Sequence, residues 1–174
     1  MKYKGETDLN TEMVERVARK YLDSLYRLAI TYCRNSEDAE DAIQNAFLKL
    51  MKTDTEFSDD EHIHRWLCKV TINECKTIWR LFNRHPVISL EEYMEDNDLE
   101  LNTVADISPD TCREIRDAVM NLPTKYRVVL YLYYYEGYSA EEISQMVGIS
   151  QSNVQIRLMR GRNKLKELLG GSSL

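Results

Sequence analysis

Residues 139–165 read "SAEEISQMVGISQSNVQIRLMRGRNKL", and this stretch decides the fold of the C-terminal part of the chain. Ser139 is followed three residues later by Glu142, the capping-box spacing that marks the start of a helix. Gly148 can adopt a positive φ and so end this short helix in a tight turn. Ser150 then caps a second helix. A helix, a short glycine-containing turn and a second helix form the helix-turn-helix pattern.

The second helix, predicted to extend through Leu169, has an apolar and a polar face. The apolar positions recur at steps of three and four residues, which is typical of a face packed on a core. They are Val154, Leu158, Gly161, Leu165 and Leu168. The outward positions carry groups that contact phosphates and base edges when a recognition helix lies in the major groove of DNA. They are Gln151, Ser152, Asn153, Gln155, Met159 and Arg160.

The charge of this helix stands out in a chain whose formal net charge is −6. Its four basic residues, with no acid between them, are Arg157, Arg160, Arg162 and Lys164. Most of the excess acid lies elsewhere, because residues 84–122 carry 10 acidic and 3 basic side chains. Lysine and arginine that neutralise phosphates release counterions and drive DNA binding. A solvated basic helix without a ligand is the alternative, but the capping box, glycine turn and basic face together favour DNA binding.

Three further amphipathic helices are predicted in residues 1–83. The first runs from about Asn10 to Tyr32. A second begins at Ser36, which we expect to cap it. A third runs from about Glu61 to Phe82, where one face is apolar and another is basic and polar. The apolar positions of this third helix are Ile63, Trp66, Leu67, Val70 and Ile78; the basic and polar ones are Arg65, Lys69, Asn73, Lys76 and Arg80.

The remaining segments complete a prediction of an all-α fold with two small helical domains. Residues 84–110 are acidic, lack periodicity and contain Pro86 and Pro109, so we interpret them as a flexible linker. The segment "KYRVVLYLYYYEGY" could form a strand by composition, but its helical neighbours and Gly137 favour a helix. The expected domains are residues 1–83 and 111–174.

Several classes of function are not expected. There is no apolar run long enough to cross a bilayer and no secretory signal, so we expect a cytoplasmic protein. The four cysteines are predicted to be reduced and packed as small hydrophobic residues. A metal site from Cys68, Cys75, His62 and His64 is conceivable but lacks a known ligand spacing. No catalytic constellation or phosphate-binding glycine loop is present, so neither an enzyme nor a cofactor is predicted.

The block "LPTKYRVVLYLYYYEGYSAEEISQMVGISQSNVQIRLMRGRNKLKELL" resembles the −35-reading C-terminal domain of bacterial extracytoplasmic-function (ECF) sigma factors. The blocks "SEDAEDAIQNAFLKLMK" and "HIHRWLCKVTINECKTIWR" are similar to the N-terminal domain of the same group. The resemblance covers nearly the whole chain in the right order. It implies a non-enzymatic subunit that binds core RNA polymerase, through the β′ clamp helices and β flap, and promoter DNA. It also implies an anti-sigma partner.

The resemblance also implies roles for individual residues. Contact with the β′ clamp helices falls to Asp41, Gln44 and Leu48. Recognition and melting of the −10 element falls to Arg65, Lys69, Asn73, Lys76 and Arg80, with help from the loop at residues 53–60. Recognition of the −35 element falls to Ser152, Asn153, Gln155, Arg157, Met159 and Arg160. In the family a basic residue and then a small polar one are common where this chain has Gln155 and Ile156, which implies a different −35 preference or weaker binding.

Three questions remain open from sequence. A stand-alone helix-turn-helix regulator would use residues 1–83 for dimerisation or sensing, although the basic positions around Asn73 do not suit an apolar dimer face. The tyrosine-rich segment, Tyr131–Tyr138, is predicted either to belong to the core or to form a surface for the β flap or an anti-sigma factor. The acidic linker is either a solvated tether or a mimic of nascent RNA in the polymerase exit path.

Overall fold

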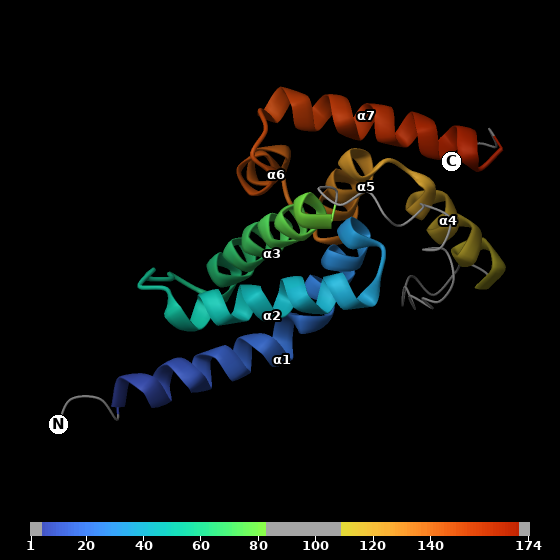
Figure 1. The fold of residues 1–174 in the computed structure, drawn as a ribbon. Coiled ribbons are helices and arrows are strands. Elements are labelled where there is room, and N and C mark those ends of the chain that lie inside the picture. Colours follow the sequence, from blue (N-terminus) through green and yellow to red (C-terminus); the bar gives the residue numbers. More distant parts are fainter. Residues whose placement is uncertain (1–4, 83–108, 171–174) are drawn as a thin grey trace. The chain divides into compact units, whose positions relative to one another are not determined.

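The computed structural model describes residues 5–82 and 109–170, and within these ranges it is helical without any strand (Figure 1). The chain divides into two compact units, residues 1–92 and 93–174. The prediction of an all-α protein with two helical domains is confirmed. Most of the predicted linker, residues 84–108, lies outside the described residues, and its last two positions already belong to the next helix.

The N-terminal unit consists of three helices that all pack against one another: α1 (Gly5–Cys33), α2 (Ser36–Lys52) and α3 (Asp60–Phe82). α1 begins five residues earlier than its apolar pattern predicted. The core contains aliphatic and alanine side chains from each helix, and alanines on α2 allow its neighbours to approach closely. The fully buried members include Val17, Leu25, Ala39, Ala42, Ala46, Leu50, Leu67 and Ile72.

The cap of α2 differs from the sequence prediction by one residue. Asn35, rather than Ser36, accepts a hydrogen bond from the backbone N–H of Asp38 at 2.8 Å through its side chain. Its amide group also donates to the Asp38 carboxylate at 2.8 Å. Arg34 makes the sharp turn before it with a φ of 69°. Because the Asn35 side chain both accepts from and donates to Asp38, the Ser36 hydroxyl is not required to cap the helix.

The buried face of α3 is broader than predicted. Ile63 and Leu67 are buried, but Trp66, Val70 and Ile78 are only half-buried. Smaller and more polar side chains take their place in the core, because α3 is packed by α1 on one side and by α2 on the other. The additional buried residues are His64, Cys68, Thr71, Ile72, Glu74 and Cys75.

The C-terminal unit contains α4 (Pro109–Asn121), α5 (Thr124–Leu130), the π-helical turn η1 (Tyr131–Tyr135), α6 (Ala140–Val147) and α7 (Gln151–Leu168). The ambiguous tyrosine-rich segment is therefore helical, as predicted, although its second half widens into a π-helix. Tyr138 is buried, whereas Tyr133 and Tyr134 are exposed. The segment thus contributes both to the core and to the surface.

Arg127 is the largest fully buried side chain in the described residues, and no pattern in the sequence predicts its burial. Its guanidinium donates hydrogen bonds to the carbonyls of Met120 at 2.9 Å and Leu122 at 2.8 Å, at the C-terminal end of α4. It also reaches the hydroxyl of Thr124 at 3.2 Å. A cation at a helix C-terminus satisfies carbonyls that have no partner within the helix. Arg127 therefore joins α4 to α5.

Candidate nucleic-acid interface

The helix-turn-helix consists of α6, a tight turn and α7, and its local signals act as predicted. The backbone N–H and hydroxyl of Ser139 both donate to the Glu142 carboxylate, at 2.9 and 2.8 Å, and the Glu142 N–H donates back to the hydroxyl at 3.3 Å. Gly148 ends α6 with a φ of 77°. The Ser150 hydroxyl accepts from the N–H of Asn153 at 3.3 Å and caps α7. These contacts fix the direction in which α7 leaves the turn.

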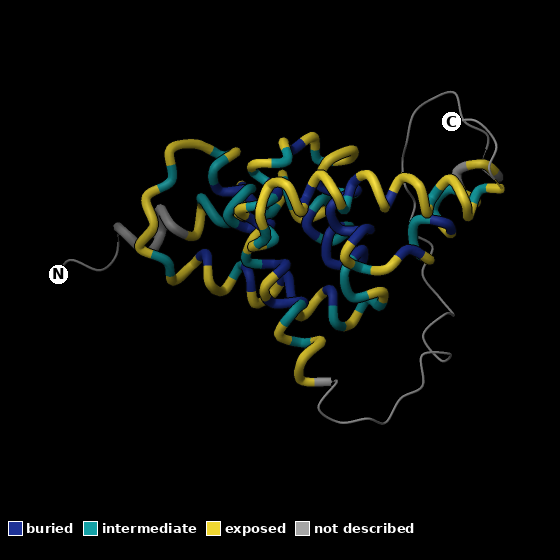
Figure 2. The backbone as a smooth tube through the Cα atoms, turned by 90° about the horizontal axis from the view of Figure 1, so that it is seen from above, coloured by how far each residue is buried: buried dark blue, intermediate teal, exposed yellow. Residues whose placement is uncertain are grey.

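α7 is held by one side only. Val154, Leu158 and Gly161 are buried, and a methyl group added at Gly161 would lie 3.0 Å from a side-chain carbon of Leu130 on α5. This confirms the predicted close helix approach. Leu165 is half-buried and Leu168 is exposed, so the apolar face ends earlier than predicted. Most of the remaining surface of α7 is exposed (Figure 2).

The predicted −35 residues lie on this open surface. Five of the six are exposed, and Arg157 is half-buried near the edge of the packed side. The five exposed residues are Ser152, Asn153, Gln155, Met159 and Arg160. Arg162 differs from the other basic residues because it donates a hydrogen bond to the Tyr134 hydroxyl at 3.1 Å. That contact ties α7 to the π-helical turn.

The basic and polar positions of α3 share one face. At about 100° per residue they fall within roughly a quarter of the helix circumference. Lys69, Asn73 and Arg80 are exposed, and Arg65 and Lys76 are half-buried. The N-terminal unit therefore presents a continuous row of cations with one amide, long enough to follow a nucleic-acid backbone.

An aromatic cluster lies at the start of this row. Phe57, in the loop between α2 and α3, makes edge-to-face contacts with His62 (ring centroids 5.3 Å apart) and with Trp66 (5.7 Å). All three side chains are half-buried. Aromatic faces of this kind can stack on unpaired bases. Sequence reasoning assigned a role to the loop but missed Phe57, whose signal was a lone aromatic residue in an otherwise polar stretch.

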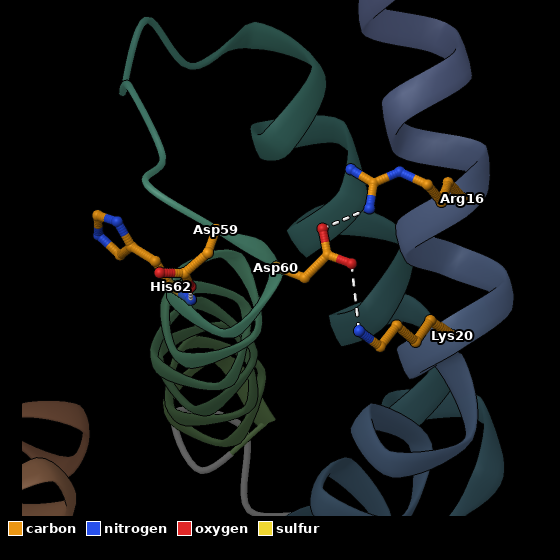
Figure 3. A network of polar contacts seen from close by, with 5 residues as sticks. All are labelled: Arg16, Lys20, Asp59, Asp60 and His62. Carbon is orange, nitrogen blue, oxygen red and sulfur yellow. Dashed lines mark hydrogen bonds and ion pairs between the residues drawn. The ribbon is translucent and has the colours of Figure 1, made fainter.

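Ion pairs and a cap hold the first turn of α3 in place (Figure 3). Asp60 accepts hydrogen bonds from Arg16 and, at 3.1 Å, from Lys20, both on α1. These two cations, Arg16 above all, hold the pKa of Asp60 below its usual value. Asp59 accepts from the backbone N–H of His62 at 2.7 Å, and this bond lowers the pKa of Asp59. The start of α3 is thereby fixed to α1.

Comparison with known proteins assigns both units to one family. The Sigma-70 region 2 family model matches residues 17–84, and the Sigma-70 region 4 model matches residues 112–165. The ECF RNA polymerase sigma factor SigM of Mycobacterium tuberculosis is 30% identical over 156 residues, which cover 90% of this chain and 76% of SigM. The chain belongs to the ECF sigma factors.

Further relatives lead to the same family. ECF sigma factor SigW of Bacillus subtilis is 27% identical over 177 residues, covering 95% of this chain and 91% of SigW. The sigma factor RpoE of Bartonella quintana, solved in complex with the anti-sigma factor NepR, shares the fold with a TM-score of 0.70 and 21% identity. That match covers 91% of this ECF sigma factor and 98% of RpoE. The resemblance stated from the sequence is therefore confirmed.

A third surface of this ECF sigma factor lies on α2. Asp41, Gln44 and Leu48, at spacings of three and four residues, are all exposed, and Leu48 exposes 45% of its surface. Met51, one turn further on, exposes 47%. Exposed leucine and methionine beside polar groups are typical of a protein contact. Gln44 also borders a groove between α1 and α2 that is lined by Leu22 and Phe47.

The cysteines and histidines considered for a metal site are structural. His64 stacks on Tyr21, with ring centroids 4.3 Å apart, and shares a hydrogen bond with Ser24 at 3.0 Å. Cys68 and Cys75 are buried and, as predicted, are not joined in a disulfide. A hydrogen bond with the Cys33 thiol, together with burial, raises the pKa of Cys75. Among the described residues no group of three or more potential ligands could hold a metal ion, and none of their helices could span a membrane.

Proposed function

We propose that the two units of this ECF sigma factor divide the recognition of a promoter between them. Residues 1–83 would bind core RNA polymerase and the −10 element, and residues 111–174 would read the −35 element. The observation that carries this division is that each unit presents its own exposed, basic helix face, on α3 and on α7. A stand-alone regulator would need only the second of these faces.

In the C-terminal unit, α7 would lie in the major groove. Its N-terminal half would contact base edges through Asn153, Gln155 and Arg160, while Ser152, Met159 and Arg157 would complete the surface. The short side chains and the tight turn at Gly148 would let the backbone at the start of α7 approach the DNA closely. Amides and guanidinium groups form the paired hydrogen bonds that distinguish bases.

In the N-terminal unit, α3 would follow the non-template strand of the melted −10 element. Arg65, Lys69, Lys76 and Arg80 would neutralise phosphates, and Asn73 would bond an unpaired base. Capture of unpaired bases by stacking and hydrogen bonds offsets the cost of unstacking them, a few kcal/mol per base. Strand opening driven by binding in this way needs no catalytic residue.

Protein partners would use the surfaces on α2 and on the π-helical turn. Asp41, Gln44 and Leu48 would contact the β′ clamp helices. Exposed Tyr133 and Tyr134 would contribute to contact with the β flap or with an anti-sigma factor. Support for an anti-sigma factor comes from RpoE of Bartonella quintana, which was solved in complex with the anti-sigma factor NepR. We place this activity in the cytoplasm, where RNA polymerase acts.

Transcription from a pool of genomic promoter fragments, with core polymerase and with or without this protein, tests the proposal. New defined transcript starts should depend on the protein. Asn73→Ala and Arg160→Ala should each lower their yield about tenfold, the effect of one base contact of roughly 1–3 kcal/mol. Asn121→Ala and Arg113→Ala, on the exposed surface of α4, are matched controls that should leave the yield unchanged.

Two DNA ligands separate the roles of the two helices. With the holoenzyme, Arg160→Ala should weaken binding to duplex −35 DNA, and Asn73→Ala should weaken binding to DNA whose −10 element is single-stranded. Loss of both activities in both variants would contradict the division between the units. If no transcript start depends on the protein, yet it binds duplex DNA without polymerase, it is a stand-alone helix-turn-helix regulator.

A further inference from the structure

Ile156 occupies an unusual place on α7. The buried residues Val154, Leu158 and Gly161 define the packed side of the helix, and at about 100° per residue Ile156 points almost directly away from it. It exposes 40% of its surface. A β-branched side chain at an exposed helix position stabilises neither the core nor the helix.

The neighbours of Ile156 form a strip without charge along the middle of the open side. This central strip consists of Ser152, Ile156, Met159 and Asn163, all of them exposed. Basic residues lie on both sides of it: Arg157, Arg160 and Lys164 on one, and Arg162 on the other. A helix in the major groove has a phosphate backbone on each side and base edges in front. The outer charges, Arg157, Lys164 and Arg162, are therefore placed for the backbones, and the central strip, with Arg160 at its edge, is placed for the bases.

The major groove offers only one apolar group to such a strip, which is the C5-methyl group of thymine. We infer that Ile156 reads a thymine methyl group in the −35 element, with Met159 covering the same contact from the next turn. This inference rests on the proposed function, because it takes α7 to be the −35-reading helix. It also explains why this chain has Gln155 and Ile156 where the family commonly has a basic residue and then a small polar one. At these positions the chain loses a phosphate contact and gains an apolar contact with a base.

Replacing thymine by deoxyuridine tests this directly, since it removes the methyl group and leaves base pairing intact. The holoenzyme, formed from core polymerase and the full chain, is given a promoter that it transcribes, with each −35 thymine replaced in turn. At one or two positions the wild type should lose about fourfold in open-complex formation, the effect of burying one methyl-sized group. Ile156→Ser should be equally active on thymine and deoxyuridine there, and Ile156→Val should keep most of the preference.

Leu168→Ser is the matched control, because Leu168 is also exposed on α7 but lies outside the central strip. It should keep the wild-type ratio between the two bases. The inference is overturned if the promoter has no −35 thymine, or if no thymine position is sensitive in the wild type. It is also overturned if Ile156→Ser keeps the ratio while Met159→Ser removes it. If Ile156→Ser lowers activity by the same factor on both bases, so that the wild-type ratio between them is kept, the inference is overturned and the side chain contacts a protein partner instead.

Failure of the proposed function gives a different result. In that case the holoenzyme would not transcribe the unmodified promoter, and no base comparison could be made at all. A circular dichroism melt of Ile156→Ser should match that of the wild type, because the side chain contributes nothing to the buried side of α7.

Discussion

The helices α3 and α7 each carry a basic face, but they are held in very different ways. α3 packs on both α1 and α2, buries side chains between Ile63 and Cys75, and leaves a basic and polar row of about a quarter of its circumference. α7 packs on α5 and α6 through one narrow side and is open elsewhere. A helix that enters a DNA groove must expose most of its circumference. A helix that binds an unpaired strand can be packed on two sides, and this packing keeps its binding residues in fixed positions.

This contrast can be measured, because both tryptophans of the chain, Trp66 and Trp79, lie on α3. Tryptophan fluorescence therefore reports on the N-terminal unit alone. Far-ultraviolet circular dichroism reports on the helices of both units. Together they show which unit a substitution destabilises.

The largest effect is expected in the N-terminal core. Leu67→Ala should lower the free energy of unfolding by about 3–4 kcal/mol, because it leaves a cavity at a fully buried position between helices. The measurement is urea unfolding followed by tryptophan fluorescence. Leu81→Ala, at a position of the same helix that is 59% exposed, is the control and should change little. Similar losses in both variants would contradict the packing of α3 described above.

A somewhat smaller effect is expected from Arg127→Met in the C-terminal unit. This substitution keeps much of the volume but removes the charged hydrogen bonds to the carbonyls of Met120 and Leu122, for a loss of about 2–3 kcal/mol. The circular dichroism transition should shift while tryptophan fluorescence does not. Arg113→Met, exposed on α4, should have no effect on either signal. A shift of the fluorescence in Arg127→Met would show that the two units unfold together.

The smallest effect concerns the ion pairs at the start of α3. Asp60 has a lowered pKa in the folded protein, so its contribution to stability is present above the unfolded pKa and is lost as the pH falls through the folded value. Asp60→Asn should therefore be slightly less stable than the wild type at pH 7, and the difference should disappear in strong acid. Fluorescence-monitored melts across this pH range measure it. A difference that persists in strong acid would have to arise from something other than the charge of Asp60.

Local signals in the sequence predicted the helix-turn-helix almost completely. The capping box at Ser139, the glycine at 148 and the cap at Ser150 are contacts within a few residues of one another, so the sequence specifies them directly. The sequence predicts the α2 cap one residue late, because two good capping residues, Asn35 and Ser36, are adjacent. Only the backbone turn at Arg34 decides between them.

The sequence by itself determined the helical class, the two units, the recognition helix and the family. Periodicity and capping depend on residues close to one another in the chain, and the order of the motifs can be read directly from it. The tertiary structure alone decided which side chains are buried. Arg127 belongs to the core because α4 ends beside it, and His64 and Cys75 belong there because α3 is packed on two sides. Whether a side chain is buried depends on which side chains of neighbouring helices cover it, and those neighbours are distant in the sequence.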